Sequence, residues 1–191
     1  MADRNAVTKN GVINDGVPLA PRFYGRRKGR PLRVSMKRLL DEDLPQFAFD
    51  PARLIDDQFG RKADRFLEIG FGGGEHLAGL AAAMPNYDFI GAEPFINGVA
   101  SLLRHIQEQQ LGNIRIWPND VRLIMHSLGA ASLAGAFIMF PDPWPKKRHA
   151  ARRILQTTLL DQLAVMIRPG GRLILASDDS TAKSWILQAA T

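Results

Sequence analysis

The sequence predicts an α/β fold of the Rossmann-like kind, a three-layer sandwich in which a mostly parallel sheet is covered by helices on both faces. Two observations predict it. From about residue 65 onward, short apolar runs alternate with segments of helical periodicity, and a glycine-rich connection follows the first apolar run. Such alternation indicates parallel strands joined by right-handed helical crossovers.

The elements follow in order along the chain. Apolar runs predict five strands, at 65–70, 87–93, 114–118, 133–140 and 172–177. Between them, apolar residues at helical spacing predict helices over 77–84, 99–106 and 160–167, and a last helix from about Ser180. The third helix should stop at Arg-Pro-Gly-Gly, residues 168–171, because proline and glycine interrupt helices.

Length and composition bound the molecule. With 191 residues the chain can bury one sizeable core. We expect a basic, partly disordered leader over residues 1–60 and a single domain over 61–191. The absence of cysteine fits a reducing compartment, and no signal peptide or run of membrane-spanning length is present. These features predict a cytoplasmic protein without a membrane partner.

The charge distribution predicts an acidic partner. The net charge is +6 and the pI is near 10.1. Two basic clusters carry much of it: residues 22–38, which hold eight Lys and Arg and no acid, and Lys146, Lys147, Arg148, Arg152 and Arg153. The first cluster could be a solvated arm or a phosphate contact. The second adjoins Trp144, and aromatic and basic side chains together are typical of nucleic-acid contacts.

The loop from Phe140 to His149, Phe-Pro-Asp-Pro-Trp-Pro-Lys-Lys-Arg-His, is the most specific motif of the chain. Its three prolines restrict the backbone, so Asp142 and Trp144 can be held in place. The loop leaves the carboxyl end of a predicted central strand, where open α/β sheets bind their ligands. Trp144 could either stack on a base or anchor the loop.

Acidic residues follow three successive strands and indicate the ligand. Glu68 precedes Gly70 and Gly72, but Glu75 stands where the dinucleotide fingerprint needs its third glycine, so a pyrophosphate would be disfavoured. An acid at Glu68 suits a ligand with an ammonium and a sulfonium. Glu93 could accept the ribose hydroxyls and Asp120 an adenine amino group, although Asp120 could also be a helix N-cap. These residues predict S-adenosylmethionine.

The motifs Leu67–Gly72, Gly91–Glu93, Asn119–Asp120 and Phe140–His149 resemble those of the bacterial tRNA (guanine-N7-)-methyltransferases. The resemblance implies a class I methyltransferase fold and methyl transfer from S-adenosylmethionine to N7 of a guanine in the tRNA variable loop, nucleotide 46. It also implies roles for matching residues. Asp142 is the catalytic residue, and Lys146 and Asp178 contact the substrate. The cofactor residues are Glu68, Gly70, Gly72, Glu93, Asn119 and Asp120, and the RNA-binding residues are Lys147, Arg148, His149, Arg152 and Arg153.

The chemistry agrees with these residue types. Guanine N7 carries a lone pair and can attack the sulfonium methyl without prior deprotonation, so no strong general base is needed. Asp142 could accept the guanine N1 and exocyclic amino hydrogens and so position the base. Three histidines, His76, His105 and His126, lack ligand spacing, so we expect no metal site.

The resemblance is incomplete at the carboxyl end. The chain ends at Thr191, whereas the pattern of the family continues with two further strands. We therefore expect a C-terminally truncated domain with an unpaired fifth strand. A non-catalytic tRNA-binding relative is the alternative function, and a nicotinamide-dependent oxidoreductase is disfavoured by Glu75. Monomer and homodimer are both compatible with the sequence.

Overall fold

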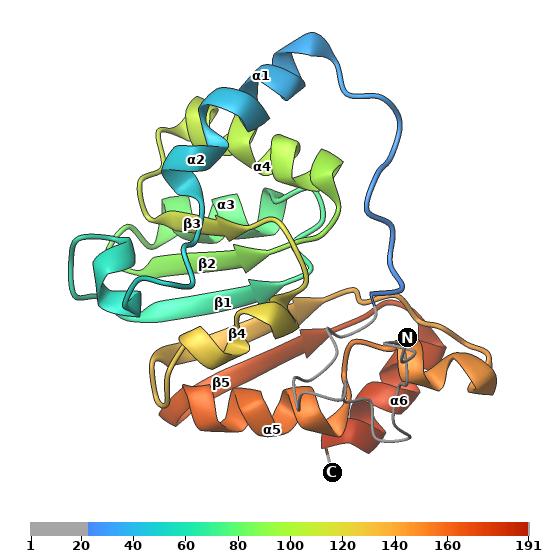
Figure 1. Ribbon diagram of the computed structural model, residues 1–191. Helices are drawn as coiled ribbons and strands as arrows, with labels where there is room; N and C mark the ends of the chain where they lie inside the picture. The colour runs from blue at the N-terminus through green and yellow to red at the C-terminus, as the bar shows by residue number, and fades with distance from the viewer. Residues whose placement is uncertain (1–22, 191) are drawn as a thin grey trace, which may run out of the picture.

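The computed structural model describes residues 23–190 and contains a five-stranded sheet in the order β3-β2-β1-β4-β5 (Figure 1). All four neighbouring pairs are parallel. The strands are β1 (Arg65–Ile69), β2 (Asp88–Ala92), β3 (Ile114–Trp117), β4 (Leu133–Met139) and β5 (Ile167–Ala176). The predicted α/β, Rossmann-like fold class is confirmed.

Helices pack on both faces of the sheet, and a hydrophobic core lies on each face. The first core joins one face of β1, β2 and β4 to α5 (Thr157–Met166) and α6 (Ser180–Ala190), with Leu133 and Leu163 fully buried. The second joins the other face to α3 (Glu75–Ala83) and α4 (Ile96–Gln109), with Phe89 and Leu102 fully buried. Because β1 and β2 contribute apolar side chains to both cores, they read as continuous apolar runs in the sequence.

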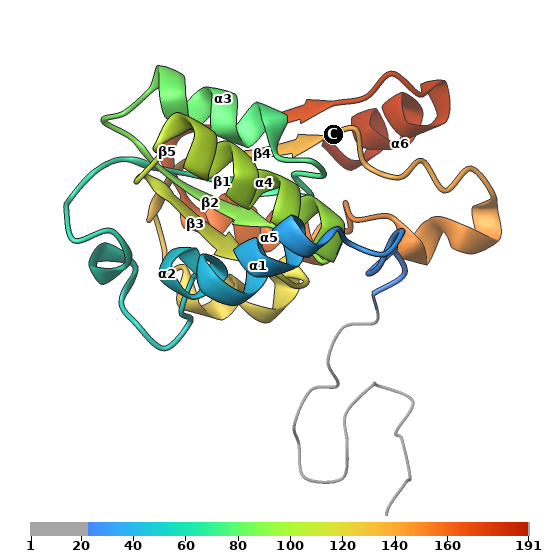
Figure 2. The same cartoon turned by 90° about the horizontal axis from the view of Figure 1, so that it is seen from above.

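The described part of the predicted leader packs against this domain. Helix α1 (Val34–Glu42) lies along α4 in both ribbon views, and α2 (Leu44–Phe47) follows it (Figures 1 and 2). Phe49 N then donates to Ile116 O at 2.8 Å, which ties the chain to β3. Residues 1–22, including Arg22 of the first basic cluster, lie outside the described residues. The domain boundary at residue 60 stays a prediction.

The junction between α5 and β5 differs from the expectation. The helix ends at Met166, and β5 begins at Ile167, five residues earlier than predicted. The Arg-Pro-Gly-Gly stretch lies inside this strand, where the pairing shifts register between Leu133 and Gly135. A bulge of this kind tolerates proline, and β5 is an edge strand among the described residues, so the backbone N–H that Pro169 lacks is dispensable. The segment 121–128, considered as a possible helix, forms two 3-10 turns, η2 (Val121–Leu123) and η3 (Met125–Ser127).

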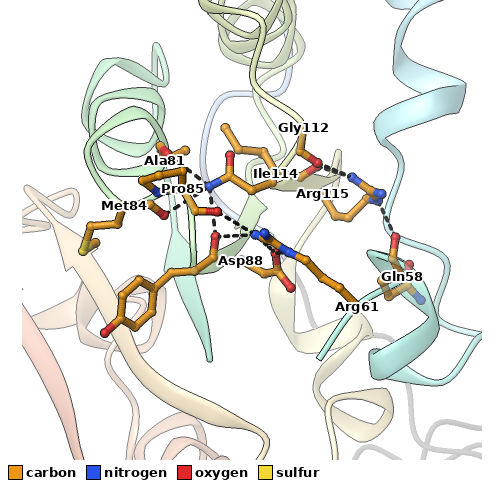
Figure 3. Close-up of polar contacts among 11 residues, drawn as sticks. Gln58, Arg61, Ala81, Met84, Pro85, Asp88, Gly112, Ile114 and Arg115 are labelled. Carbon is orange, nitrogen blue, oxygen red and sulfur yellow. Dashed lines mark hydrogen bonds and ion pairs between the residues drawn. The ribbon is translucent and has the colours of Figure 1, made fainter. Parts of the chain in front are cut away.

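A polar cluster fixes the amino ends of β2 and β3 (Figure 3). Asp88 is fully buried, and its Oδ1 accepts from Nε and Nη2 of Arg61 at 2.9 and 2.6 Å. Asn113 donates to the carbonyls of Ala81 and Tyr87. These bonds satisfy backbone groups where α3 returns to the sheet, so the cluster sets the β1–α3–β2 connection.

No helix between residues 23 and 190 combines the length and apolarity that a membrane crossing needs.

Candidate functional site

A cavity of about 330 Å³ lies at the carboxyl ends of the strands. Its wall is assembled from the loops after β1, β2, β3 and β4 and from a segment of the leader. The helices of a parallel sheet return to the amino ends of the strands, which leaves this end open for loops that carry ligand-binding residues. The apolar part of the wall includes Ile69, Val121 and Ile138.

The loop after β1 is shaped by glycines. Gly72 has a φ of +57°, and a Cβ there would meet no atom within 4 Å, so this position leaves space beside the cavity. Gly98, in the first turn of α4, allows this helix to lie close to the loop after β1, because a Cβ at position 98 would lie 2.0 Å from the Gly72 carbonyl oxygen. Helix α4 can therefore pack directly against the loop.

Glu93 joins this loop to the start of α4. It is 8 % exposed, and its carboxylate accepts from Gly72 N at 2.8 Å and from Phe95 N at 2.9 Å. Burial raises the pKa of Glu93, the two backbone N–H groups oppose that rise, and the charge of Asp142 adds to it. Asp142, on the loop after β4, thus lies close enough to Glu93 for their charges to interact across the cavity.

Asp120 lines the cavity and is also the N-cap of η2. Its Oδ1 accepts from Arg122 N at 3.0 Å, and its carboxylate forms an ion pair with the Arg122 guanidinium. Asp120 thus caps a turn, as one interpretation of the sequence predicted, and it is 4 % exposed in the cavity wall. Its contact with an adenine amino group stays a prediction. The partner Arg122 also lines the cavity.

The proline-rich loop is held from two sides. Trp185 Nε1 of α6 donates to Pro143 O at 3.0 Å, and Arg153 Nη2 donates to Trp144 O at 3.3 Å. Phe140 and Trp144 have positive φ values of 50° and 37°, which non-glycine residues rarely adopt. Such conformations cluster at functional sites, where the surrounding contacts hold them in place. Asp142 lines the cavity and its side chain is exposed to solvent.

The structure brings some predicted site residues together and separates others. Those that line the cavity are Gly70, Gly72, Glu93, Asp120, Asp142, Arg152 and Arg153. Those outside its lining are Glu68, Asn119, Lys146, Lys147, Arg148, His149 and Asp178. Their functional roles stay predictions in both groups.

Glu68 lies in an environment that the sequence did not predict. Its side chain is 2 % exposed, and its Oε2 lies 2.9 Å from His76 Nδ1 of α3. Burial raises the pKa of Glu68, while the contact with His76 lowers it. From the sequence we predicted only that His76 lies in a helix and lacks metal-ligand spacing. In the structure it is the partner of a buried carboxylate.

The segment after β4 carries the second basic cluster on a six-residue 3-10 helix, η4 (Lys147–Arg152). Lys146, Lys147 and Arg148 are exposed, and the His149 ring meets the Trp144 ring edge-on at 5.6 Å between centroids. Partial burial and the positive charges of Arg152, Arg148 and Lys146 lower the pKa of His149. An excess of cations beside an open cavity favours a polyanionic ligand.

Sequence reasoning missed the contribution of the leader. Phe23, Tyr24, Gly25 and Arg26 line the cavity, although they are about forty residues away from the first strand in the chain. The available signal was the pair of aromatic residues next to the first basic cluster, which repeats the composition around Trp144.

The side chains of the cavity wall indicate which ligands fit the cavity. Two buried carboxylates at the ends of β2 and β3 offer acceptors for hydroxyl and amino groups, and the apolar wall between them suits a flat ring. In the described residues, no group of three or more His, Cys, Asp or Glu side chains could hold a metal ion.

Comparison with known proteins shows the family of the chain. Residues 62–191 match the model of a family described as "Putative methyltransferase". The tRNA (guanine-N(7)-)-methyltransferase of Rhodospirillum rubrum is 47 % identical over 178 residues, which is 89 % of this chain and 70 % of the relative. The enzyme of the same name from Paramagnetospirillum magneticum is 46 % identical over 175 residues, 86 % of this chain and 72 % of the relative. The chain belongs to the tRNA (guanine-N(7)-)-methyltransferase family.

Solved structures agree with the fold of this methyltransferase family. The antibiotic-resistance methyltransferase Kmr superimposes with a TM-score of 0.50 at 18 % identity, over 74 % of this chain and 80 % of that one. The aminoglycoside resistance methyltransferase NpmB1 also gives 0.50, at 15 % identity over 72 % and 69 %. At these identities the likeness shows the fold alone. The resemblance expected from the motifs of the sequence is confirmed.

Proposed function

We propose that this chain transfers a methyl group from S-adenosylmethionine to N7 of a guanine in the variable loop of tRNA, nucleotide 46. The observation that carries the proposal is the meeting of Glu93, Asp120 and Asp142 with Arg152 and Arg153 around one cavity. This combination offers acceptors for a nucleoside-like cofactor and cations for a polynucleotide. The names of the relatives supply the base and the atom.

The cavity residues fit the cofactor by their chemistry. Glu93 would accept hydrogen bonds from the ribose hydroxyls, and Asp120 from the adenine amino group through the lone pairs that Arg122 leaves. The backbone around Gly70 and Gly72 would approach the amino-acid part. Glu68 would hold the ammonium, which requires its carboxylate to share or leave His76. When bound, S-adenosylmethionine supplies a methyl group on a positively charged sulfur.

Asp142 would act on the base. A carboxylate can accept both the N1 and the exocyclic amino hydrogens of guanine, and this two-point contact fixes the ring in its own plane. Its negative charge also favours the cation that develops when N7 is methylated. Because Asp142 lines the cavity and is exposed to solvent, a base of a large polynucleotide can reach it. Orientation of this kind can lower a barrier by up to roughly 7–11 kcal/mol in favourable cases.

The polar and basic residues that the family resemblance assigns to the substrate would hold the tRNA. Lys146 and Asp178 are assigned to substrate contact, and Lys147, Arg148, His149, Arg152 and Arg153 to RNA. The cations would bind phosphates and set the register of the RNA without reading sequence. The proposal places the protein in the cytoplasm, where its tRNA substrate lies. The alternative of a non-catalytic tRNA-binding relative has no observation in its favour, because the cavity keeps its carboxylates.

The deciding experiment is methyl transfer from labelled S-adenosylmethionine to unmodified tRNA, followed by strand cleavage selective for N7-methylguanine. A tRNA in which adenine replaces the variable-loop guanine is the control substrate. We expect label and cleavage at the variable loop of the first tRNA and neither in the second. Transfer to another base would refute the assigned target, and tRNA binding without transfer would support the non-catalytic alternative.

A further inference from the structure

The segment 23–30, here called the strap, runs across the carboxyl ends of the strands before α1 begins (Figure 1). Asn97 at the start of α4 clasps it, since Asn97 Oδ1 accepts from Gly29 N and Asn97 Nδ2 donates to Arg30 O, both at 2.8 Å. Ile96 N donates to Arg27 O at 3.1 Å. These bonds fix the path of the strap, and its first residues thereby reach the cavity wall.

Tyr24 of the strap and Trp144 of the proline-rich loop share one neighbour. The Arg152 guanidinium carbon lies 5.3 Å from the centroid of the Tyr24 ring and 5.1 Å from that of Trp144, over the ring in each case. Tyr24, Trp144 and Arg152 all line the cavity, and all three are half-buried. A flat cationic group therefore lies against two aromatic rings from distant parts of the chain, in the cavity that Asp142 also lines.

The guanidinium is a useful guide to what else these rings accept. It is planar and weakly hydrated, and it stacks on aromatic faces. A nucleobase is also planar and stacks on the same faces, and single-stranded or flipped-out bases are held in this way. If a base takes the place of the guanidinium on the aromatic rings, the arginine keeps its five N–H donors. These donors suit a phosphate of the same nucleotide.

We propose that Tyr24 and Trp144 form a stacking slot for a nucleobase of the RNA substrate, which the Arg152 guanidinium fills in this structure and leaves for a phosphate when the base enters. The inference rests on the proposed function for the identity of the RNA and extends it to a binding residue of the leader. The strap is then part of the substrate site, and the clasp at Asn97 positions it.

The test compares Tyr24→Ala with Tyr24→Phe, which keeps the ring and loses the hydroxyl. Binding is measured with an unmodified tRNA in which 2-aminopurine replaces the variable-loop guanine, because the fluorescence of 2-aminopurine is quenched when it stacks. We expect Tyr24→Ala to weaken tRNA binding by about 5- to 150-fold, the range that loss of one stacked base corresponds to, and to reduce the quench. Tyr24→Phe should stay within about threefold of the parent chain in affinity and keep its quench.

Three results would overturn the slot. Equal losses in Tyr24→Ala and Tyr24→Phe would assign the effect to the hydroxyl. Unchanged tRNA affinity in Tyr24→Ala would remove the ring from the RNA site. A loss of S-adenosylhomocysteine affinity, measured by calorimetry in the absence of RNA, would place the ring on the adenine of the cofactor.

Asn97→Ala provides a second route that leaves both rings intact. Loss of the clasp should weaken tRNA binding and reduce the quench, because the strap must then be ordered at the cost of binding. Full quench and full affinity in Asn97→Ala would mean that the clasp has no part in the slot. A parent chain that quenches 2-aminopurine but methylates no tRNA would refute the proposed function and leave the slot standing, whereas normal methylation by Tyr24→Ala would do the reverse.

Discussion

The carboxylates that line the cavity differ in their surroundings. This difference predicts which of them bind the cofactor and which one acts on the base. Glu93 and Asp120 are buried and already accept hydrogen bonds from the protein, from Gly72, Phe95 and Arg122. Asp142 is exposed to solvent. A carboxylate that the protein has already positioned suits a small cofactor, while an exposed one suits a base that arrives from solution.

Asp142→Asn should therefore abolish most of the transfer while sparing the cofactor. The amide offers only one acceptor and no charge, so we expect kcat to fall by at least about a hundredfold, as for the loss of one preorganised polar contact at a reacting group. The dissociation constant of S-adenosylhomocysteine should change less than about threefold. Asp161→Asn, at an exposed position of α5, is the matched control and should behave as the parent chain. A large loss of cofactor affinity in Asp142→Asn would reassign Asp142 to the cofactor.

His149 should make tRNA binding depend on pH. Its pKa is lowered in the free protein, by partial burial and the surrounding cations, and a nearby phosphate would raise it in the complex. A group whose pKa is higher in the complex contributes affinity that is complete below the free-state pKa and is lost as pH rises through the bound-state pKa. We expect tRNA affinity to increase as pH falls from about 7 to about 5, and His149→Ala to flatten that dependence. The dissociation constant measured across this range at constant ionic strength decides, and a flat curve for the parent chain would exclude His149 from phosphate contact.

At the scale of elements, the sheet is anchored at one end and functional at the other. The amino ends of β2 and β3 are fixed by Arg61 and Asp88 (Figure 3) and by Asn113, whereas the carboxyl ends lead into the cavity loops. The cluster contains a fully buried carboxylate whose only basic partner at ion-pair distance in the described residues is Arg61. A substitution in this cluster should therefore lower the stability of the fold without changing the chemistry of the cavity.

Arg61→Ala should destabilise the fold without changing the cavity. Removing one partner of a buried pair costs about 3–5 kcal/mol, but Arg61 itself is 40 % exposed, so we expect about 2 kcal/mol in the free energy of unfolding from urea titrations. Arg38→Ala breaks an exposed pair with Glu42 on α1, and because water screens such pairs it should change the free energy of unfolding much less than Arg61→Ala does. Equal effects of the two substitutions would contradict the importance assigned to burial at Asp88.

Which elements the sequence predicts depends on how local their causes are. The strand β1 and helix α4 followed from apolar periodicity, because that pattern is set by residues within one or two turns. The early start of β5 did not, because Arg-Pro-Gly-Gly is a helix stop by local rules and becomes a bulged edge strand only through its pairing with β4. For the same reason Glu68 was read without His76, a partner that the turn into α3 supplies.

On the scale of the whole molecule, the fold combines two basic clusters that are far apart in sequence. The strap carries Arg26 to the cavity wall, and η4 brings Arg152 and Arg153 to the same wall. Most other cations of these clusters are exposed, including Arg30, Arg33, Lys147 and Arg148. The net charge of +6 is thus concentrated in part around the carboxyl ends of the strands.

This concentration should appear in the salt dependence of tRNA binding. Each lost phosphate contact lowers the slope of log K against log salt by about 0.9 on the duplex scale. The double variant Lys147→Ala/Arg148→Ala changes only exposed side chains of η4, and we expect its slope to fall by about 1.8. Lys62→Ala, exposed near the amino end of β1, should leave the slope unchanged. Equal slopes in the double variant and the parent chain would remove these two residues from the RNA contact.

The sequence by itself determined the α/β class, the family through its Phe140–His149 and Leu67–Gly72 motifs, and the strand ends at which Glu93, Asp120 and Asp142 lie. These features are encoded by neighbouring residues, whose spacing fixes periodicity and turn chemistry. Only the tertiary structure decided that the leader lines the cavity, that Arg152 lies against both Tyr24 and Trp144, and that Glu68 pairs with His76. Such contacts join segments separated by loops of many residues, and the path of those loops is set by packing on the finished sheet, which no local pattern encodes.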